Sequence, residues 1–188
     1  MIKEIVKDQE FLAQVSEPAT IEDAQVATDL VDTMNHLSES CACLAANQIG
    51  YNKAIIAFAD DNNKVHVMYN PKLIQFMGPF EATEGCLSLD EESTSTRYQL
   101  IRVAYQEEQN GKMLSRVKKY SGFTAQAIQH AIDHTKGMLV SVSPRGAVTR
   151  DFRRKLSTTC ELSEVMKYRD AIRTKLCHYN PRVVGVAE

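Results

Sequence analysis

The sequence contains no long hydrophobic run, and its first eight residues mix apolar with charged side chains. A secretory signal or a membrane-spanning helix needs an uninterrupted apolar stretch of roughly 7–20 residues. This absence predicts a cytoplasmic protein without a membrane partner. Internal repeats and low-complexity segments are also missing, so a repeat architecture is excluded. Nothing in the sequence indicates binding to DNA.

A disulfide framework is lacking as well. The five cysteines are odd in number and irregularly spaced, at Cys41, Cys43, Cys86, Cys160 and Cys177. This usage favours a reducing compartment in which thiols stay free to bind metal. With 188 residues, 44% hydrophobic and 24% charged, the chain has the composition of an ordinary globular protein. We therefore expect a single domain that covers residues 1–188.

Charge is distributed unevenly along the chain. The formal net charge is −2, yet residues 145–188 contain ten lysines and arginines against five acidic residues. This segment therefore carries +5 and the preceding residues −7. Two interpretations remain open: contact with RNA or another polyanion, such as the ribosome, or a solvated helix face.

Hydrophobic periodicity predicts a mixture of helices and strands. Residues 21–38 have helical spacing, and Thr20 with Asp23 forms a candidate N-cap pair. Residues 38–50 are predicted to be a loop. Gly122 opens a second, largely buried helix that begins with Phe123, and a third is expected at 161–178. The predicted strands are 54–58, 65–69, 73–76, 100–105 and 114–120, with turns at 60–63 and at Asn110–Gly111. Strands followed by a helix that crosses them favour an α+β fold.

Candidate metal ligands lie on the second predicted helix. His130 and His134 are four residues apart, so they project from nearly the same face and can bind one metal ion. In the hydrolytic form of this motif a glutamate follows the first histidine, but here that position is Ala131. Cys86, next to Gly85, is the best third ligand, because a tetrahedral catalytic site uses three protein ligands and leaves one position for water. The alternative for Cys86 is a buried apolar cysteine.

Three blocks of sequence, taken together, resemble the peptide deformylases, which remove the formyl group from the initiator methionine of new bacterial proteins. The blocks are Leu44-Ala45-Ala46-Asn47-Gln48-Ile49-Gly50, Glu84-Gly85-Cys86-Leu87-Ser88 and Gln129-His130-Ala131-Ile132-Asp133-His134. The resemblance covers roughly residues 20–140 and leaves 145–188 as a basic helical extension. It implies antiparallel sheets packed around a central metal-binding helix. It also implies the N-terminal peptide of a nascent protein as the partner.

The resemblance also implies roles for individual residues. Cys86, His130 and His134 would bind Fe²⁺, or Zn²⁺ or Ni²⁺ in its place. Gln48 and the backbone N–H of Leu87 would donate to the oxyanion as a metal-bound hydroxide attacks the formyl carbon. Asp133 faces away from the histidine pair and would orient its neighbours. The expected substrate-binding or supporting positions are Cys43, Leu44, Gly50, Glu84, Gly85 and Arg97, and for Arg97 a structural ion pair is an equal alternative.

Two positions depart from the family pattern. Cys41-Ala42-Cys43 stands where the family has two glycines around one residue, and the added thiols would narrow the substrate channel. Ala131 lacks the glutamate that would carry a proton from the metal-bound water to the leaving amine, a contribution of ~10²–10⁴-fold. Three explanations of this exchange remain open. The chain could be a diverged paralogue, it could hydrolyse a different or easier bond with Glu84 or a carboxylate of the bound substrate as proton carrier, or Ala131 could be an engineered knock-out. The functional hypotheses are therefore a deformylase with reduced or lost catalysis, a non-catalytic N-terminal peptide-binding paralogue, a metal-dependent amidohydrolase of altered specificity, or an interaction module with a vacant site.

Overall fold

The computed structural model describes residues 1–139. The predicted helix at 161–178 and the basic segment 145–188 lie outside the described residues. The predicted α+β class is confirmed: one five-stranded antiparallel sheet combines with helices. In chain order the elements are α1 (Gln9–Leu12), η1 (Ile21–Asp23), α2 (Ala24–His36), β1 (Cys43–Ala45), η2 (Ala46–Ile49), β2 (Ile55–Ala59), β3 (Val65–Glu84), β4 (Ser93–Gln109), β5 (Lys112–Ser121) and α3 (Gly122–Thr135). Over residues 1–139, no helix has the length and apolar character needed to span a membrane.

The predicted first helix is confirmed in two parts, η1 and α2. Thr20 caps the start: its side chain accepts from the backbone N–H of Glu22, while its own backbone N–H donates to Asp23 at 2.7 Å. This reciprocal capping satisfies backbone donors that the first turn cannot pair internally. It fixes where the helix begins.

The sheet has the simplest order, β1-β2-β3-β4-β5, with every neighbouring pair antiparallel. Both predicted turns connect neighbouring strands. Between β2 and β3, the Asp60 carboxylate accepts from the backbone N–H groups of Asn62 and Lys64 at 2.9 and 3.0 Å. Between β4 and β5, Asn110 and Gly111 adopt φ angles of 54° and 74°, which suits a tight hairpin turn.

Two predictions about strands were wrong in detail. The strands expected at 65–69 and 73–76 are parts of one long strand, β3, whose pairing with β4 shifts between Tyr69 and Lys72 and between Leu73 and Gln75. Asn70 has φ 51° at the first shift. The segment 38–50 is not a loop throughout, because it contains β1 and η2. β1 forms by pairing with β2. The three side chains of β1 alone show no strand pattern from which this pairing could be predicted.

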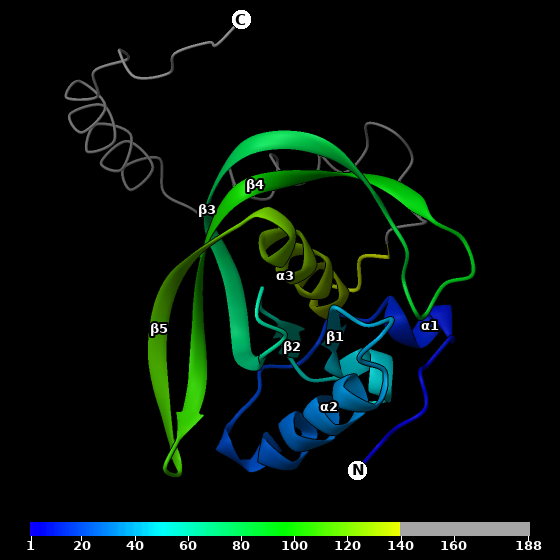
Figure 1. Cartoon of the computed structure of the whole chain (residues 1–188). Helices are drawn as coiled ribbons and strands as arrows, with labels where there is room; N and C mark the ends of the chain where they lie inside the picture. Colours follow the sequence, from blue (N-terminus) through cyan, green and yellow to red (C-terminus); the bar gives the residue numbers. More distant parts are fainter. Residues whose placement is uncertain (140–188) are drawn as a thin grey trace, which may run out of the picture. The chain divides into compact units, whose positions relative to one another are not determined.

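Helices cover both faces of β1 and β2. Leu44 and Ile55 point into a buried cluster with α2, whereas Ala45 and Ile56 point into a second cluster with α3. This alternation follows from the two-residue side-chain period of a strand. Figure 1 shows α3 lying between β1–β2 and the long curved β3 and β4. The sheet thus surrounds a largely buried helix, as predicted, although its first-turn residue Phe123 is 67% exposed and was wrongly expected to be buried.

Candidate metal centre

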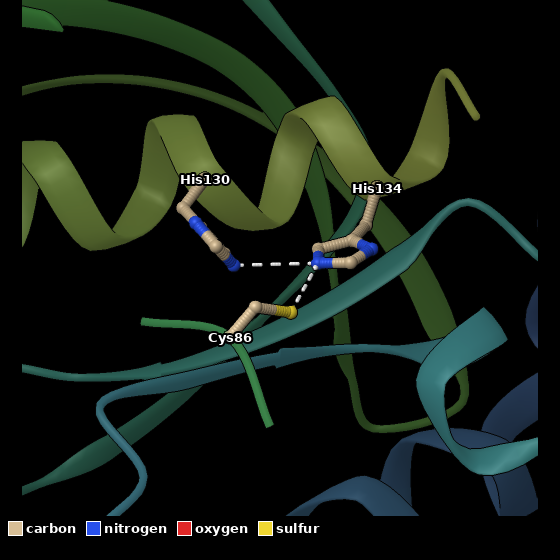
Figure 2. Close-up of side chains that lie close together, drawn as sticks. All are labelled: Cys86, His130 and His134. Atoms are coloured by element: carbon tan, nitrogen blue, oxygen red, sulfur yellow. Dashed lines mark hydrogen bonds between the residues drawn. The ribbon is translucent and has the colours of Figure 1, made fainter. Parts of the chain in front are cut away.

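Three donor atoms converge between α3 and the connection from β3 to β4. His130 Nε2 lies 3.3 Å from His134 Nε2, and the Sγ of Cys86 lies 3.3 Å from the same His134 atom. One ligand atom from each residue falls within 4.8 Å of the other two. Figure 2 shows the two histidines pointing from neighbouring turns of α3 toward Cys86. The spacing of the two histidines on α3 and the reversal of the chain after β3, which carries Cys86, together bring the three donor atoms close to one another.

The donor set fits a divalent metal ion. Tetrahedral bonds of about 2.0–2.3 Å separate neighbouring donors by about 3.4–3.6 Å, close to the distances observed here. Imidazole nitrogen and thiolate suit zinc, iron and nickel. Cys86 and His130 also line a cavity of about 440 Å³, so the ligand group borders a space that a small molecule could enter. Cys86, His130 and His134 are therefore the described residues that could hold the ion.

Glu84 fixes the ring of His130. The Nδ1 atom of His130 lies 3.1 Å from Glu84 Oε2, and Arg97 holds the same carboxylate through Nε and Nη2 at 2.9 and 2.7 Å. Burial alone would raise the pKa of Glu84, but these hydrogen bonds and charges outweigh it and lower the pKa to about 2. The ionised carboxylate accepts the Nδ1 proton, which leaves Nε2 available for a metal.

Arg97 connects this carboxylate to a second one. Its Nη1 donates to Asp133, and the arginine is 5% exposed. Asp133 thus binds a neighbour and is not one of the three clustered donors. Of the two roles considered for Arg97, the structure provides the structural ion pair, with Glu84 on one side and Asp133 on the other. The network anchors the helix that carries both histidines to β4.

The two histidines differ in their affinity for a proton. For His130, burial would lower the pKa, but hydrogen bonds to Cys86 and Glu84 raise it. For His134, burial lowers the pKa, and the charges of His130 and Arg97 lower it further. The Nδ1 atom of His134 is buried and has no hydrogen-bond partner within residues 1–139. A metal needs an unprotonated nitrogen on each ring, so its uptake by a chain in which His130 is protonated would release a proton to solvent.

Gln48 is oriented by its own turn. Its Oε1 accepts from the backbone N–H of Ala45 at 2.9 Å, and its Nε2 lies 3.3 Å from Ser88 Oγ and 3.6 Å from Cys86 Sγ. The amide N–H₂ is therefore directed toward the ligand group. Leu87, which directly follows Cys86, also lines the cavity. Ser88 was not singled out in the sequence, although it belongs to the block that contains Cys86.

The other expected substrate positions separate into two groups. Cys43, Glu84 and Gly85 line the cavity. Leu44 is fully buried in the cluster around α2, and Gly50 ends η2 with φ 88°, a conformation that side chains rarely adopt. Neither Leu44 nor Gly50 is among the residues that line the cavity. Gly50 ends the turn that carries Gln48, and Leu44 belongs to the strand that precedes this turn.

The two departures from the family pattern occupy different surroundings. Cys41 and Cys43 line the cavity, as expected for thiols beside a channel, and Cys41 Sγ donates to the Cys43 carbonyl at 3.3 Å. Burial raises the pKa of the Cys41 thiol to about 11 and raises that of Cys43 as well. Ala131 is fully buried among apolar residues and is not part of the cavity wall. No proton-carrying side chain therefore stands at position 131.

Two other histidines, His36 and His66, are not part of the ligand group. His66 pairs with Asp60 at 2.7 Å and stacks on Phe58, and His36 ends α2. His178 lies outside the described residues. One cavity residue that the sequence reasoning missed is Gln126, four residues before His130. The same helical spacing that identified the histidine pair would have identified it.

Comparisons with known proteins agree with this geometry. A family model described as polypeptide deformylase matches residues 2–143. A peptide deformylase of Clostridium beijerinckii is 42% identical over 140 residues, which cover 74% of this chain and 100% of that protein. Solved structures of a peptide deformylase from Legionella pneumophila and of one from Thermus thermophilus have TM-scores of 0.68 and 0.67 at 26% and 29% identity. They cover 86% and 83% of this chain, and 100% and 95% of the respective structures are matched.

Proposed function

This chain belongs to the peptide deformylase family, and we propose that it binds N-formyl peptides at a divalent metal ion and removes their formyl group slowly. The observation that carries the proposal is the convergence of Cys86, His130 and His134 beside a cavity of about 440 Å³. When bound, the ion supplies Lewis-acid polarisation of the formyl carbonyl and activation of water near neutral pH.

The chain's own residues hold and polarise the substrate. Gln48, oriented by Ala45, directs its N–H₂ group toward Cys86 and can donate to the carbonyl oxygen. The backbone N–H of Leu87 is the second donor in the proposal. Two such donors stabilise negative charge that develops only as the carbonyl is attacked. Glu84 keeps the His130 ring in the orientation that presents Nε2.

Proton transfer to the leaving amine is the step that this chain performs poorly. Ala131 has no group that can carry a proton. Glu84 cannot replace it effectively, because both of its oxygens are engaged by Arg97 and His130 and its pKa is lowered to about 2. Loss of such acid–base help slows a reaction by ~10²–10⁴-fold. We therefore propose turnover reduced by that factor.

The test compares three proteins: the unmodified chain, Ala131→Glu and Ala131→Gln. Metal content is measured after purification without chelator, and formate release from formyl-Met-Ala-Ser gives kcat/KM. Ala131→Glu should raise kcat/KM by ~10²–10⁴-fold, whereas Ala131→Gln, equal in size but without a base, should not. Because Ala131 is fully buried, melting temperatures establish that each variant is folded. The unmodified chain gives a measurement that needs no variant, with kcat expected below about 0.1 s⁻¹.

Each rival hypothesis has its own result. Less than about 0.2 metal ions per chain would contradict the proposed metal centre. Equal and high activity with and without Glu at position 131 would identify an amidohydrolase that draws its proton from another group. Peptide binding without turnover in any of the three proteins would identify a non-catalytic binding paralogue.

Finer features belong to the same proposal. The ion is Fe²⁺, or Zn²⁺ or Ni²⁺ in its place, and the substrate is the formylmethionine end of a nascent protein in the cytoplasm. The basic segment 145–188 would contact the ribosome, a proposal that rests on its charge alone. Replacement of Arg153, Arg154 and Lys155 by alanine should abolish co-sedimentation with ribosomes, and unchanged co-sedimentation would eliminate this contact.

A further inference from the structure

Gln126 places an amide inside the cavity that borders the metal ligands. It precedes His130 by four residues on α3, so both side chains project from the same face of the helix. Gln126, His130 and Cys86 all line the cavity of about 440 Å³. The amide therefore faces the same space as two of the three candidate ligands.

The side chain of Gln126 makes no hydrogen bond within the described part of the chain, residues 1–139. Gln129, three residues later, is fully engaged, accepting from the Tyr98 N–H and donating to the carbonyls of Tyr98 and Ala125. The Gln129 amide is thus used within the fold. The amide of the half-buried Gln126 still has one acceptor oxygen and two donor hydrogens for other partners. The cavity wall also includes the apolar side chains of Phe123, Ala127 and Leu87.

The first side chain of a bound peptide has to enter this space. Three bonds separate the formyl carbon from the Cβ atom of the first residue, a distance of about 4 Å at most. With the formyl group at the Cys86, His130 and His134 donors, this side chain begins beside them, and the cavity is the space that borders them. An apolar side chain there would cover the Gln126 amide without giving it a partner, which is unfavourable for a polar group.

We propose that Gln126 is a specificity-determining residue that hydrogen-bonds the side chain of the peptide's first residue. The cavity then favours a side chain that carries an amide or another strong acceptor over an unbranched alkyl chain of the same length. This inference rests on the proposed function, because it takes peptide binding at the metal centre as given. Methionine, whose thioether is only a weak acceptor, falls between the two.

The test measures affinity and does not depend on turnover. Isothermal titration calorimetry on the zinc-loaded full chain compares the tripeptides Gln-Ala-Ser, Met-Ala-Ser and norleucine-Ala-Ser. One neutral hydrogen bond corresponds to roughly a three- to tenfold change in Kd, so Gln-Ala-Ser should bind tighter than norleucine-Ala-Ser by that factor. Gln126→Leu should abolish or invert the preference. Gln109→Leu, at an exposed position beside the β4–β5 turn, is the matched control and should preserve it.

The outcomes separate this inference from the proposed function. Equal affinity of the three peptides for the unmodified chain would overturn the role of Gln126 while leaving peptide binding intact, and this comparison needs no variant. A preference that persists in folded Gln126→Leu would also overturn it. If none of these peptides binds, the same comparison is made with their N-formyl forms, and failure of the N-formyl peptides to bind zinc-loaded protein would contradict the proposed function itself.

Discussion

Arg97 holds two carboxylates of the candidate site, Glu84 and Asp133, and has almost no exposed surface. Removing one partner of a buried ion pair leaves a charge without solvent or counter-ion, which typically costs about 3–5 kcal/mol of stability. We expect Arg97→Met to lower the free energy of unfolding by that amount. Chemical denaturation followed by circular dichroism measures it. Arg116→Met is the control, because Arg116 and Glu107 form a pair that is still partly exposed to solvent and is worth about 0–1 kcal/mol.

Acid should reduce the difference between Arg97→Met and the unmodified chain. The pKa of Glu84 is lowered in the folded protein, so its stabilising contribution is present above the ordinary carboxyl pKa of 4.5 and is lost as the pH falls toward about 2. The stability gap should therefore narrow over this interval. A gap that stays constant down to pH 2, or equal losses for the two arginine variants, would contradict the role given to this network.

How much of the site the sequence could predict differs from residue to residue. The spacing of His130 and His134 indicates a shared helix face, so the pair could be inferred locally. Cys86 could be proposed as the third ligand from its chemistry and its glycine neighbour, but no spacing rule places it beside His134, because 48 residues separate the two. The contact between Arg97 and Asp133 depends on how β4 meets α3, and no spacing rule encodes that. Gln126 was within reach of the helical rule but was not considered.

At the scale of elements, Gly137 controls how α3 ends. It has φ 68°, and a Cβ atom there would lie 2.1 Å from the carbonyl oxygen of Ala13. Gly137→Ala therefore requires the backbone to move, and we expect a loss of more than about 2 kcal/mol of stability. Gly111→Ala is the matched control: its φ is 74°, but nothing lies within 4 Å of the added atom. Its loss should stay near 1 kcal/mol, the cost of the backbone conformation alone.

Thermal unfolding of both glycine variants provides the comparison. Similar melting temperatures for Gly137→Ala and Gly111→Ala would mean that the close approach of Gly137 to Ala13 does not contribute to the stability loss. A selective loss in Gly137→Ala would show that the segment after α1 supports the end of the helix that carries His134.

Elements with a clear local signal were predicted well, and those defined by partners were not. The helix capped by Thr20 and the hairpin at Asn110–Gly111 have sequence signals that act over a few residues. β1 is only three residues long and exists through its pairing with β2. The second half of β3 alternates weakly, with many exposed residues, so its length depends on β4. Phe123 has helical spacing with the core but lies in the first turn of α3, where it lines the cavity and is largely exposed.

At the scale of the whole molecule, the family match defines a unit that ends well before the C-terminus. The family model covers residues 2–143, and the Clostridium beijerinckii relative is matched along its entire length by 140 residues. We expect a protein truncated after residue 143 to fold cooperatively and to bind metal as the full chain does, since both buried clusters and all three candidate ligands precede that point. Melting temperature and metal content measure this. Aggregation, or a loss of metal on truncation, would show that residues 144–188 are needed by the unit that precedes them.

Cys86 and His134 come from segments 48 residues apart, one in the β3–β4 connection and the other in α3. An ion bound by both is therefore a cross-link as well as a chemical centre, comparable to a disulfide that closes a long loop. It ties the chain reversal after β3 to the helix enclosed by the sheet. Chelation would accordingly remove a cross-link between these two segments. Resistance of the β3–β4 connection to proteases would then show whether the ion is bound, even in a chain whose turnover is slow.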